Sequence, residues 1–481
     1  MLFNSFEFIF VFLPIVFVGY YLFNKINFNL SKFWLLAGSL FFYSWWNPIY
    51  LPLILSSMIV NFFIGTLLGK LKNKAYRQFS LVIGLVFNIG LMGYFKYYDF
   101  FITNINTIFS TDLTILHLVL PLAISFFTFQ QIGYLVDSYR YETKGYRFLN
   151  YALFVSFFPQ LIAGPIVHHS HVIPQFENRK NKVINYSNIS LGIFIFTLGL
   201  FKKIGIADTF AVWATTGYGL SEQLSMVDAW ITSLSYTLQI YFDFSGYSDM
   251  AIGLGLLFNI KLPFNFNSPY KALSIQDFWR RWHITLSSFL TKYIYIPLGG
   301  SRKGIRRTYI HILIVFFISG FWHGAGWTFV LWGLAHGVAS VIYRWWSTRD
   351  FVLPKVVAWF ITFQFINITW VLFRAPDFQV ALNVMKAMFG FGDSVFSKGL
   401  ISESFFNSEP IVSFEMITIP NVLVVILMVV LFFLITVFAK NTNELGSNFK
   451  PNIYRVLFTT ILFVYSVFQL QKVSEFLYFN F

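Results

Sequence analysis

The sequence contains no cysteine among its 481 residues. Disulfide bonds, catalytic thiolates and cysteine-ligated metal sites are therefore excluded. The start of the chain also lacks the basic region and small-residue cleavage site of a secretory signal peptide. We therefore expect the first apolar run, residues 6–23, to be retained as a membrane span.

Charged residues are scarce as well, at 11% of the chain against about 25% in a typical soluble domain. Hydrophobic residues make up 57%, and phenylalanine occurs 64 times, which is more than one water-soluble core could bury. The apolar runs are long and continuous, whereas transmembrane barrels show alternating segments of about ten residues. The composition predicts an all-α polytopic membrane protein.

A spanning helix needs about 20 apolar residues. Candidate spans lie near 6–23, 33–46, 50–69, 79–95, 118–136, 191–215, 229–257, 309–323, 325–343, 356–373, 421–438 and 453–471. Two more apolar segments, 149–163 and 286–299, contain prolines and glycines and are expected to be re-entrant or interfacial. No internal repeat is visible, so we expect one membrane domain over residues 1–481.

Lysine and arginine outnumber aspartate and glutamate by 34 to 20, which gives a net charge of +14. In a membrane protein such an excess gathers in cytoplasmic loops, so nucleic-acid binding is not expected. Basic and poorly basic loops alternate along the predicted spans. This places both termini outside and the most basic loop, Lys261 to Arg307, in the cytoplasm. Lys202 and Lys203 fit poorly because they fall inside a span, and we expect them to face an internal cavity.

The stretch from Asp277 to Trp327 concentrates ionisable groups between apolar segments, where such groups are costly and usually functional. His323 lies at the junction of two spans, and histidine is the usual general base near neutral pH. The glycines beside it allow close backbone approach. The alternative is a structural histidine that hydrogen-bonds across helices.

His283 follows Arg280 and Arg281 on a segment that reads as an amphipathic helix, with Trp279 and Trp282 suited to the membrane interface. One interpretation is a pocket for an anionic donor whose phosphates bind the arginines. The other is an interfacial helix that binds anionic lipid headgroups. The two arginines support both equally.

Two further groups of residues are candidates for chemistry. Asp243 and Asp249 lie inside a long apolar segment, where one carboxylate could orient a histidine or belong to an ion pathway. His168, His169 and His171 form a His-His-x-His run. No metal site is expected there, because no cysteine or nearby carboxylate completes it in the sequence.

The motifs, taken together, resemble the membrane-bound O-acyltransferases. They are Phe158–Ile166 (FPQLIAGPI), Asp243–Asp249, Asn265–Tyr270 (NFNSPY, which contains Asn267), Phe278–His283 (FWRRWH) and Trp322-His323-Gly324, in this order. The resemblance is closest to the bacterial branch that acetylates alginate and peptidoglycan and exports D-alanylated teichoic acid, and it covers essentially the whole chain.

The resemblance implies a ring of about 11–12 helices around a central funnel, with His323 as the catalytic histidine and His283 as a second site histidine. Arg280, Arg281, Trp279, Trp322, Asp243 and Asn267 would bind the donor or support the site. The resemblance also implies that acetyl-CoA is the donor and that no cofactor or metal is bound. It further implies a location in the bacterial inner membrane and a cell-wall or exported polysaccharide as the acceptor. A soluble partner of the SGNH-hydrolase type would complete the transfer.

The chain ends Phe476-Leu477-Tyr478-Phe479-Asn480-Phe481. Such residues commonly anchor a chain at the membrane interface. The resemblance adds a second interpretation, because the teichoic-acid system uses a short C-terminal Phe-x-Tyr motif as a phenolic acyl carrier. Tyr478 would then be an acyl relay.

Two other functions use the same residues. A transporter or lipid flippase would use the buried Asp, His and Arg groups as a proton or headgroup pathway, although the two related halves common in transporters are not visible. A structural scaffold for a cell-wall complex would leave His323 and His283 unexplained.

Overall fold

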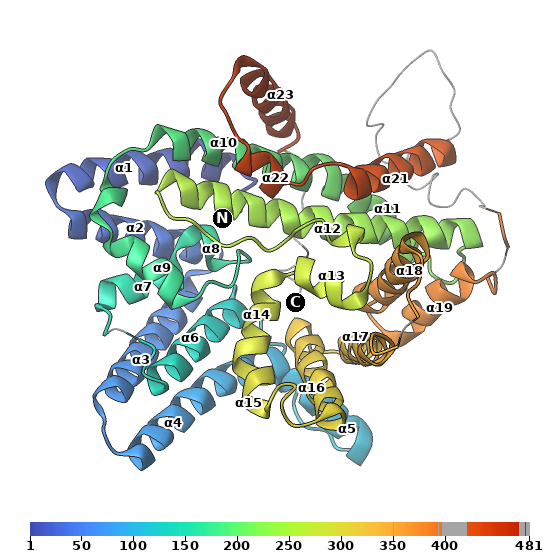
Figure 1. Ribbon diagram of the computed structural model, residues 1–481, viewed down its shortest axis with the longest axis horizontal. Helices are drawn as coiled ribbons and strands as arrows, with labels where there is room; N and C mark the ends of the chain where they lie inside the picture. The colour runs from blue at the N-terminus through green and yellow to red at the C-terminus, as the bar shows by residue number, and fades with distance from the viewer. Residues whose placement is uncertain (144, 350, 393, 397–420, 471–476, 478–481) are drawn as a thin grey trace. The chain divides into compact units, whose positions relative to one another are not determined.

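The computed structural model describes the chain except residues 144, 350, 393, 397–420, 471–476 and 478–481. Within the described residues all regular elements are helices, which confirms the all-α class (Figure 1). The α-helices are α1 (Leu13–Ile26), α2 (Phe28–Ser44), α3 (Leu51–Lys70), α4 (Lys74–Met92), α5 (Tyr98–Phe109), α6 (Ile124–Tyr139), α7 (Phe148–Ser156), α8 (Phe158–Leu161), α9 (His169–Glu177), α10 (Tyr186–Phe201), α11 (Asp208–Gly219), α12 (Met226–Leu257), α13 (Ile275–Arg281), α14 (Ile284–Leu290), α15 (Ile296–Leu298), α16 (Ile305–His323), α17 (Trp327–Trp346), α18 (Lys355–Arg374), α19 (Phe378–Met388), α21 (Asn421–Phe438), α22 (Thr442–Ser447) and α23 (Ile453–Phe468).

Six helical stretches among the described residues are long and apolar enough to cross a membrane. They are Glu7–Ile26, Pro48–Lys70, Lys74–Phe109, Tyr186–Gly219, Ile305–His323 and Lys355–Arg374, and Val422–Phe438 and Ile453–Phe468 are shorter apolar helices. The other predicted spans fall on α2, α6, α12 and α17, which do not meet the same criterion. The total of 11–12 spans around a funnel stays a prediction.

The chain divides into two compact units. Unit 1 consists of Met1–Leu200, Tyr247–Phe264 and Phe449–Val464, and unit 2 of Phe201–Gly246, Asn265–Asn448 and Tyr465–Phe481. The chain passes repeatedly from one unit to the other, and α12 contributes to both. The single domain over residues 1–481 therefore stays a prediction.

Unit 1 has an aromatic core centred on Phe158, which is fully buried. Its ring meets Phe12 and Phe258 edge to face, at centroid distances of 5.3 and 5.7 Å. Pro159 lies in the first turn of α8, where its missing N–H costs nothing. A Cβ on Gly164 would lie 2.5 Å from the Gln160 backbone. The FPQLIAGPI motif thus packs the core and makes a tight turn, while the re-entrant or interfacial position expected for this segment stays a prediction.

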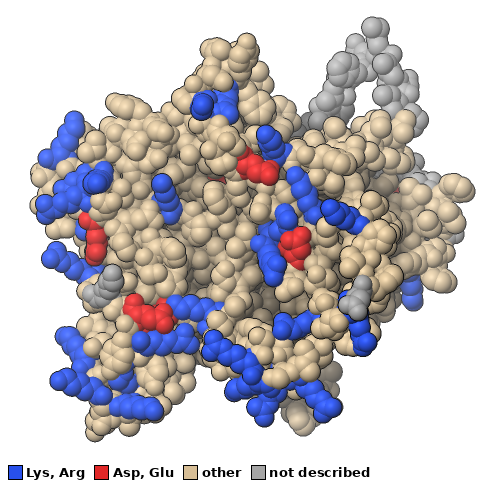
Figure 2. Space-filling view, viewed as in Figure 1, with Lys and Arg blue, Asp and Glu red and all other residues tan. Residues whose placement is uncertain are grey.

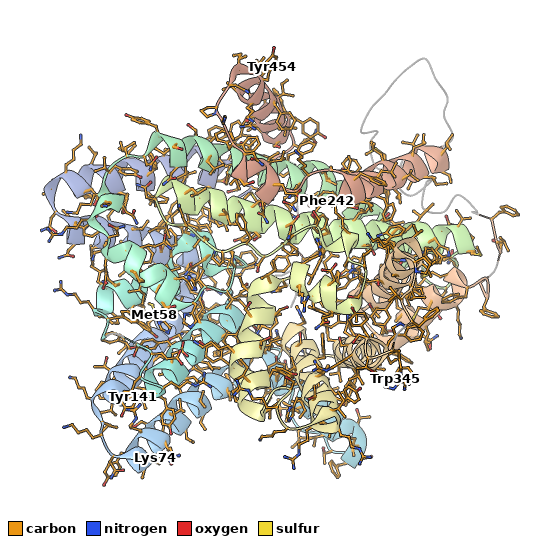
Figure 3. The ribbon with its side chains drawn as sticks, in the orientation of Figure 1. Met58, Lys74, Tyr141, Phe242, Trp345 and Tyr454 are labelled. Atoms are coloured by element: carbon orange, nitrogen blue, oxygen red, sulfur yellow. The ribbon has the colours of Figure 1, made fainter. Side chains whose placement is uncertain are left out.

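Buried amides join the helices of unit 1. Asn61 of α3 and Asn88 of α4 are both fully buried, and their side chains exchange hydrogen bonds of 3.2 and 2.6 Å. Such pairs hold helices together where lipid supplies no hydrophobic driving force. Met58 lies inside this unit, whereas Lys74 lies at the outer end of α4 (Figure 3).

Unit 2 contains a hairpin of α16 and α17, which are joined by Gly324-Ala325-Gly326. The helices approach so closely at Gly320 and Gly333 that a Cβ on either would lie 2.4 Å from a carbonyl oxygen of the other helix. Next to the hairpin, Asn367 of α18 accepts hydrogen bonds from Ser233 and Thr237 of α12. These contacts fix the end of α16, where His323 lies.

Candidate active site

His323 is the last residue of α16 and is 2% exposed. Its ring meets Trp332 nearly perpendicularly at a centroid distance of 5.1 Å, and Phe373 of α18 at 5.2 Å. The neighbouring Trp322 ring lies 5.0 Å away. Aromatic side chains of α16, α17 and α18 thus hold the imidazole in a water-poor setting.

His283 caps the start of α14 with φ 43° and ψ 54°, in the left-handed region. That conformation is uncommon for a residue with a side chain and is often found at functional sites. Two backbone hydrogen bonds hold it, from Asn267 N–H to the Arg281 carbonyl (2.9 Å) and from Ile284 N–H to the Asn265 carbonyl (3.0 Å). The NFNSPY motif therefore sets the orientation of His283.

The structure brings the two predicted histidines together. Their ring centroids are 6.4 Å apart, too far for a direct hydrogen bond but close enough for one small group to lie between them. Trp322 is near both, at 6.1 Å from His283 and 5.0 Å from His323. His283 also meets Phe244 at 4.7 Å.

The His283 ring is fully buried, and neither of its nitrogens has a hydrogen-bond partner in the described part of the chain. Buried polar atoms normally have partners, so two bare nitrogens in one side chain require an explanation. Burial also lowers the pKa of His283, because desolvation disfavours the charged ring. The side chain is a neutral imidazole that can bond a substrate.

His336 of α17 was given no role by sequence reasoning, yet it supports this site. Trp279 donates to its Nδ1 at 3.2 Å, so Nε2 carries the proton and donates to Thr369 at 3.0 Å. Its ring lies 4.8 Å from Trp332, the residue that also packs against His323. His336 is therefore a satisfied structural histidine, and no motif in the sequence marked it.

The two tryptophans of the FWRRWH motif pack within unit 2. Trp282 is 1% exposed and packs against Trp370 at 4.9 Å, while Trp279 is half-buried and hydrogen-bonded to His336. Their depth relative to the membrane interface stays a prediction.

The two arginines of the FWRRWH motif differ in their contacts. Arg281 donates from Nε to Asp277 at 2.9 Å and from Nη1 to the Asn267 carbonyl at 3.2 Å, so it holds the loop together. Arg280 is exposed and has no ion pair or hydrogen bond with any described residue. Asn267 accepts from Asn441 at 3.0 Å and anchors the segment before α22. Of the two arginines, Arg280 is the more exposed.

The basic run at the start of α16 is exposed: Arg302 and Lys303 precede the helix, and Arg306 and Arg307 lie in its first turn. On the face drawn in Figure 2, Lys and Arg side chains are far more frequent than Asp and Glu, in keeping with the net charge of +14. Thr308, by contrast, is only 1% exposed.

Asp243 is paired with a lysine rather than a histidine. Lys203, 2% exposed, lies 2.6 Å from Asp243 and 2.8 Å from Asp208. The proposal that Asp243 orients a histidine is therefore not supported, and the poor fit of Lys203 to a span is explained by this buried ion pair. Lys202 donates to Thr442 instead. The backbone of Leu477 lies beside Asp243, whereas Tyr478 lies outside the described residues.

Unit 1 holds a second cluster of ionisable groups. Oδ2 of Asp137 lies 2.6 Å from Nε2 of His168 and 2.9 Å from Nε2 of His169. The sequence argument that no carboxylate lies near these histidines is wrong, because α6 supplies one from about 30 residues away. The three groups could hold a metal ion. However, the Ser170 N–H donates to Nδ1 of His168, so Nε2 carries the proton and donates to Asp137. Both imidazoles thus contact the same carboxylate oxygen of Asp137.

Comparisons with known proteins find relatives along the whole chain. The profile of the membrane-bound O-acyltransferase family matches residues 135–375, which include both histidines. The chain is 47% identical to a peptidoglycan O-acetyltransferase of Helicobacter pylori, over the whole chain and 98% of that protein. It is 40% identical to a "Probable alginate O-acetylase" of Pseudomonas aeruginosa, over 82% of this chain and 75% of that one. A teichoic acid D-alanyltransferase of Bacillus subtilis is 25% identical over 55% of this chain and 71% of its own length.

Proposed function

Because the chain belongs to the membrane-bound O-acyltransferase family, we propose that it takes an acetyl group from cytoplasmic acetyl-CoA and passes it across the bacterial inner membrane. The final acceptors are hydroxyl groups of a cell-wall or exported polysaccharide. The chain is an O-acyltransferase and a multi-pass membrane protein. The named relatives that act on peptidoglycan and alginate support this choice of acceptor.

The observation that carries the proposal is the histidine pair. Two buried imidazoles lie 6.4 Å apart, and one of them has no protein partner for either nitrogen in the described chain. A thioester is already activated, so the reaction lacks only a base that makes a hydroxyl nucleophilic. A histidine that is held in place and shielded from water can supply that base.

The proposed acyl transfer proceeds in two steps. His323 takes the proton of the acceptor hydroxyl as its oxygen bonds to the thioester carbonyl carbon. The C–S bond then breaks, and the imidazolium returns the proton to the thiolate, which leaves as free CoA. His283 donates or accepts a hydrogen bond that positions the reacting acyl group. Arg280, which is exposed and unpaired among the described residues, contacts the phosphates of the donor.

Two further parts of the proposal rest on the family resemblance. Tyr478 would accept the acetyl group first, as a phenolic ester reactive enough to pass it on. An outer soluble partner of the SGNH type would then transfer it to the polysaccharide. Leu477, the residue before Tyr478, is 9% exposed.

A direct test is thiol release from acetyl-CoA by the purified protein in detergent. The chain has no cysteine, so a thiol reagent reports CoA alone, without background from the protein. Release that is lost in His323→Ala but kept in His117→Asn, a change at an exposed loop histidine, would support acyl transfer. Absence of release by the wild-type protein with every acceptor tried would favour the transporter or scaffold alternatives.

A further inference from the structure

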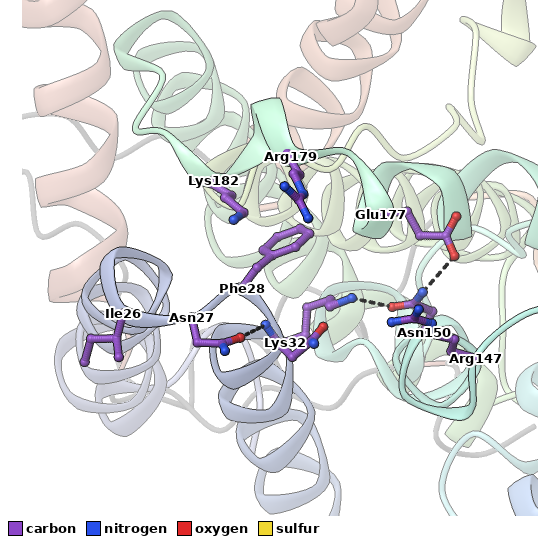
Figure 4. Close-up of a pocket in the computed structure, with 10 residues that line it drawn as sticks. Ile26, Asn27, Phe28, Lys32, Arg147, Asn150, Glu177, Arg179 and Lys182 are labelled. Atoms are coloured by element: carbon purple, nitrogen blue, oxygen red, sulfur yellow. Dashed lines mark hydrogen bonds between the residues drawn. The ribbon is translucent and has the colours of Figure 1, made fainter.

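A polar pocket of about 600 Å³ lies in unit 1. The residues that line it are distinct from the histidine pair, which belongs to unit 2. Three segments form it: the junction of α1 and α2, the start of α7, and the end of α9 with the short helix Arg179–Lys182 (Figure 4). The residues that line it are Ile26, Asn27, Phe28, Asn29, Lys32, Arg147, Asn150, Glu177, Arg179 and Lys182. It holds four cations and one carboxylate.

Most of these cations lack a protein partner. In the described part of the chain, Arg147, Arg179 and Lys182 make no ion pair or side-chain hydrogen bond, and Lys182 contacts only the Phe28 ring, at 4.6 Å. Figure 4 shows Arg179 and Lys182 directed toward Phe28 and the pocket. Four cations that share a cavity with a single carboxylate are suited to an anion.

Lys32 lies at the inner wall of the pocket and is only 6% exposed. Its Nζ donates to Asn150 at 2.9 Å, and Asn150 donates in turn to Glu177 at 2.8 Å, so no carboxylate touches the lysine. Burial lowers the pKa of Lys32; Glu177 opposes this shift, while Arg147 and Lys182 add to it. The buried ammonium is thus poorly compensated within the protein.

The charge pattern places the pocket at one membrane face. The loops that carry Arg147, Arg179 and Lys182 are rich in lysine and arginine, which is the pattern of cytoplasmic loops. The α1–α2 junction follows the first span and falls on the same side by alternation. In the structure these segments line one pocket, as expected if they lie on the same side of the membrane.

We propose that this pocket binds a phosphate-type polyanion at the cytoplasmic face. The phosphate belongs to the headgroup of an anionic phospholipid or to a soluble phosphorylated molecule. Arginine binds phosphate oxygens through paired N–H donors, and lysine adds a point charge. The proposal does not depend on acyl transfer, and its test measures binding rather than CoA release.

The experiment uses the full-length protein purified in a neutral detergent at low salt. Pyrophosphate probes the soluble source, and short-chain phosphatidylglycerol, with phosphatidylcholine of the same chain length as control, probes the lipid source. The readout is the rise in Tm followed by tryptophan fluorescence, which yields an apparent Kd. Stabilisation by pyrophosphate assigns a soluble ligand, and stabilisation by phosphatidylglycerol alone assigns a lipid.

Two kinds of variant test the assignment to this pocket. Arg179→Gln/Lys182→Gln should weaken binding by at least about tenfold, because two charged contacts are lost. The matched control Lys72→Gln/Lys74→Gln removes the same charge from an exposed loop of unit 1 and should leave binding unchanged.

Glu177→Gln should strengthen binding, since it removes the one negative charge and keeps an acceptor for Asn150. A misfolded variant could not produce such a gain. The proposal is overturned if neither probe raises the Tm, if the control variant weakens binding as much as the pocket variant, or if Glu177→Gln binds no more tightly than the wild type.

Discussion

Substitutions of two histidines of unit 2 should have opposite effects on activity and on stability. His283 makes no side-chain hydrogen bond with the described chain, whereas His336 makes two, with Trp279 and Thr369. We therefore expect His283→Asn to remove activity with little loss of stability. His336→Ala should reduce stability and leave the activity of the folded protein nearly intact.

The magnitudes follow from these contacts. Asparagine tolerates the left-handed backbone of residue 283, and no protein hydrogen bond is lost, so the free energy of unfolding should fall by at most about 1–2 kcal/mol. His336→Ala leaves the Trp279 N–H without its partner and opens a cavity beside Trp332, which should cost about 3 kcal/mol or more. Loss of a group that acts in proton transfer or positioning should lower the rate of His283→Asn by at least about tenfold.

The assays are Tm in detergent by tryptophan fluorescence, and thiol release from acetyl-CoA per folded molecule. His283→Asn should melt within a few degrees of the wild type, and His336→Ala should melt clearly lower. The reasoning is refuted if His336→Ala loses as much activity per folded molecule as His283→Asn, or if His283→Asn is the less stable of the two.

Four other outcomes are expected. His323→Ala should lower acetyl transfer by about 10²–10⁴-fold without preventing membrane insertion, and wild-type rates would show that another group is the base. Ser301→Cys should be protected from a membrane-impermeant thiol reagent in intact cells, and ready labelling would reverse the predicted topology; Thr308 is 1% exposed and too buried for the same use. Tyr478→Phe should abolish polysaccharide acetylation, and mass spectrometry should find an acetyl group on Tyr478 that is absent in His323→Ala; full acetylation by Tyr478→Phe would leave Tyr478 as an anchor. Lys203→Met should destabilise the protein by about 3–5 kcal/mol by leaving Asp243 buried and unpaired, and Lys203→Met/Asp243→Leu should recover part of that loss in Tm.

The helices could be predicted largely from the sequence. Long apolar runs gave α3 and α18 within a few residues, because lipid-facing helices must be apolar throughout. The start of α6 was placed too early, at 118 instead of Ile124, since apolar residues precede the helix but Ala123 adopts a left-handed backbone. Apolar composition does not report such a local turn.

The site was predicted in part. His283 and His323 were chosen correctly as a pair that the fold brings together, although their roles are untested. The partners of buried polar groups could not be predicted, because hydrophobic patterning does not say which polar side chains meet across helices. Lys203 and Asp243 are 40 positions apart in the sequence, and Asp137 and His168 are about 30 apart.

The length of α16 has a consequence for the direction of transfer. Its 19 residues extend over about 28 Å, close to the thickness of the hydrocarbon core. The exposed Arg306 and Arg307 lie near its first turn, and the buried His323 is its last residue. If α16 lies near the membrane normal with its basic end in the cytoplasm, as the predicted topology has it, His323 lies about one hydrocarbon core away from that end. The thioester of a cytoplasmic donor would then have to reach this depth before its acetyl group could be transferred.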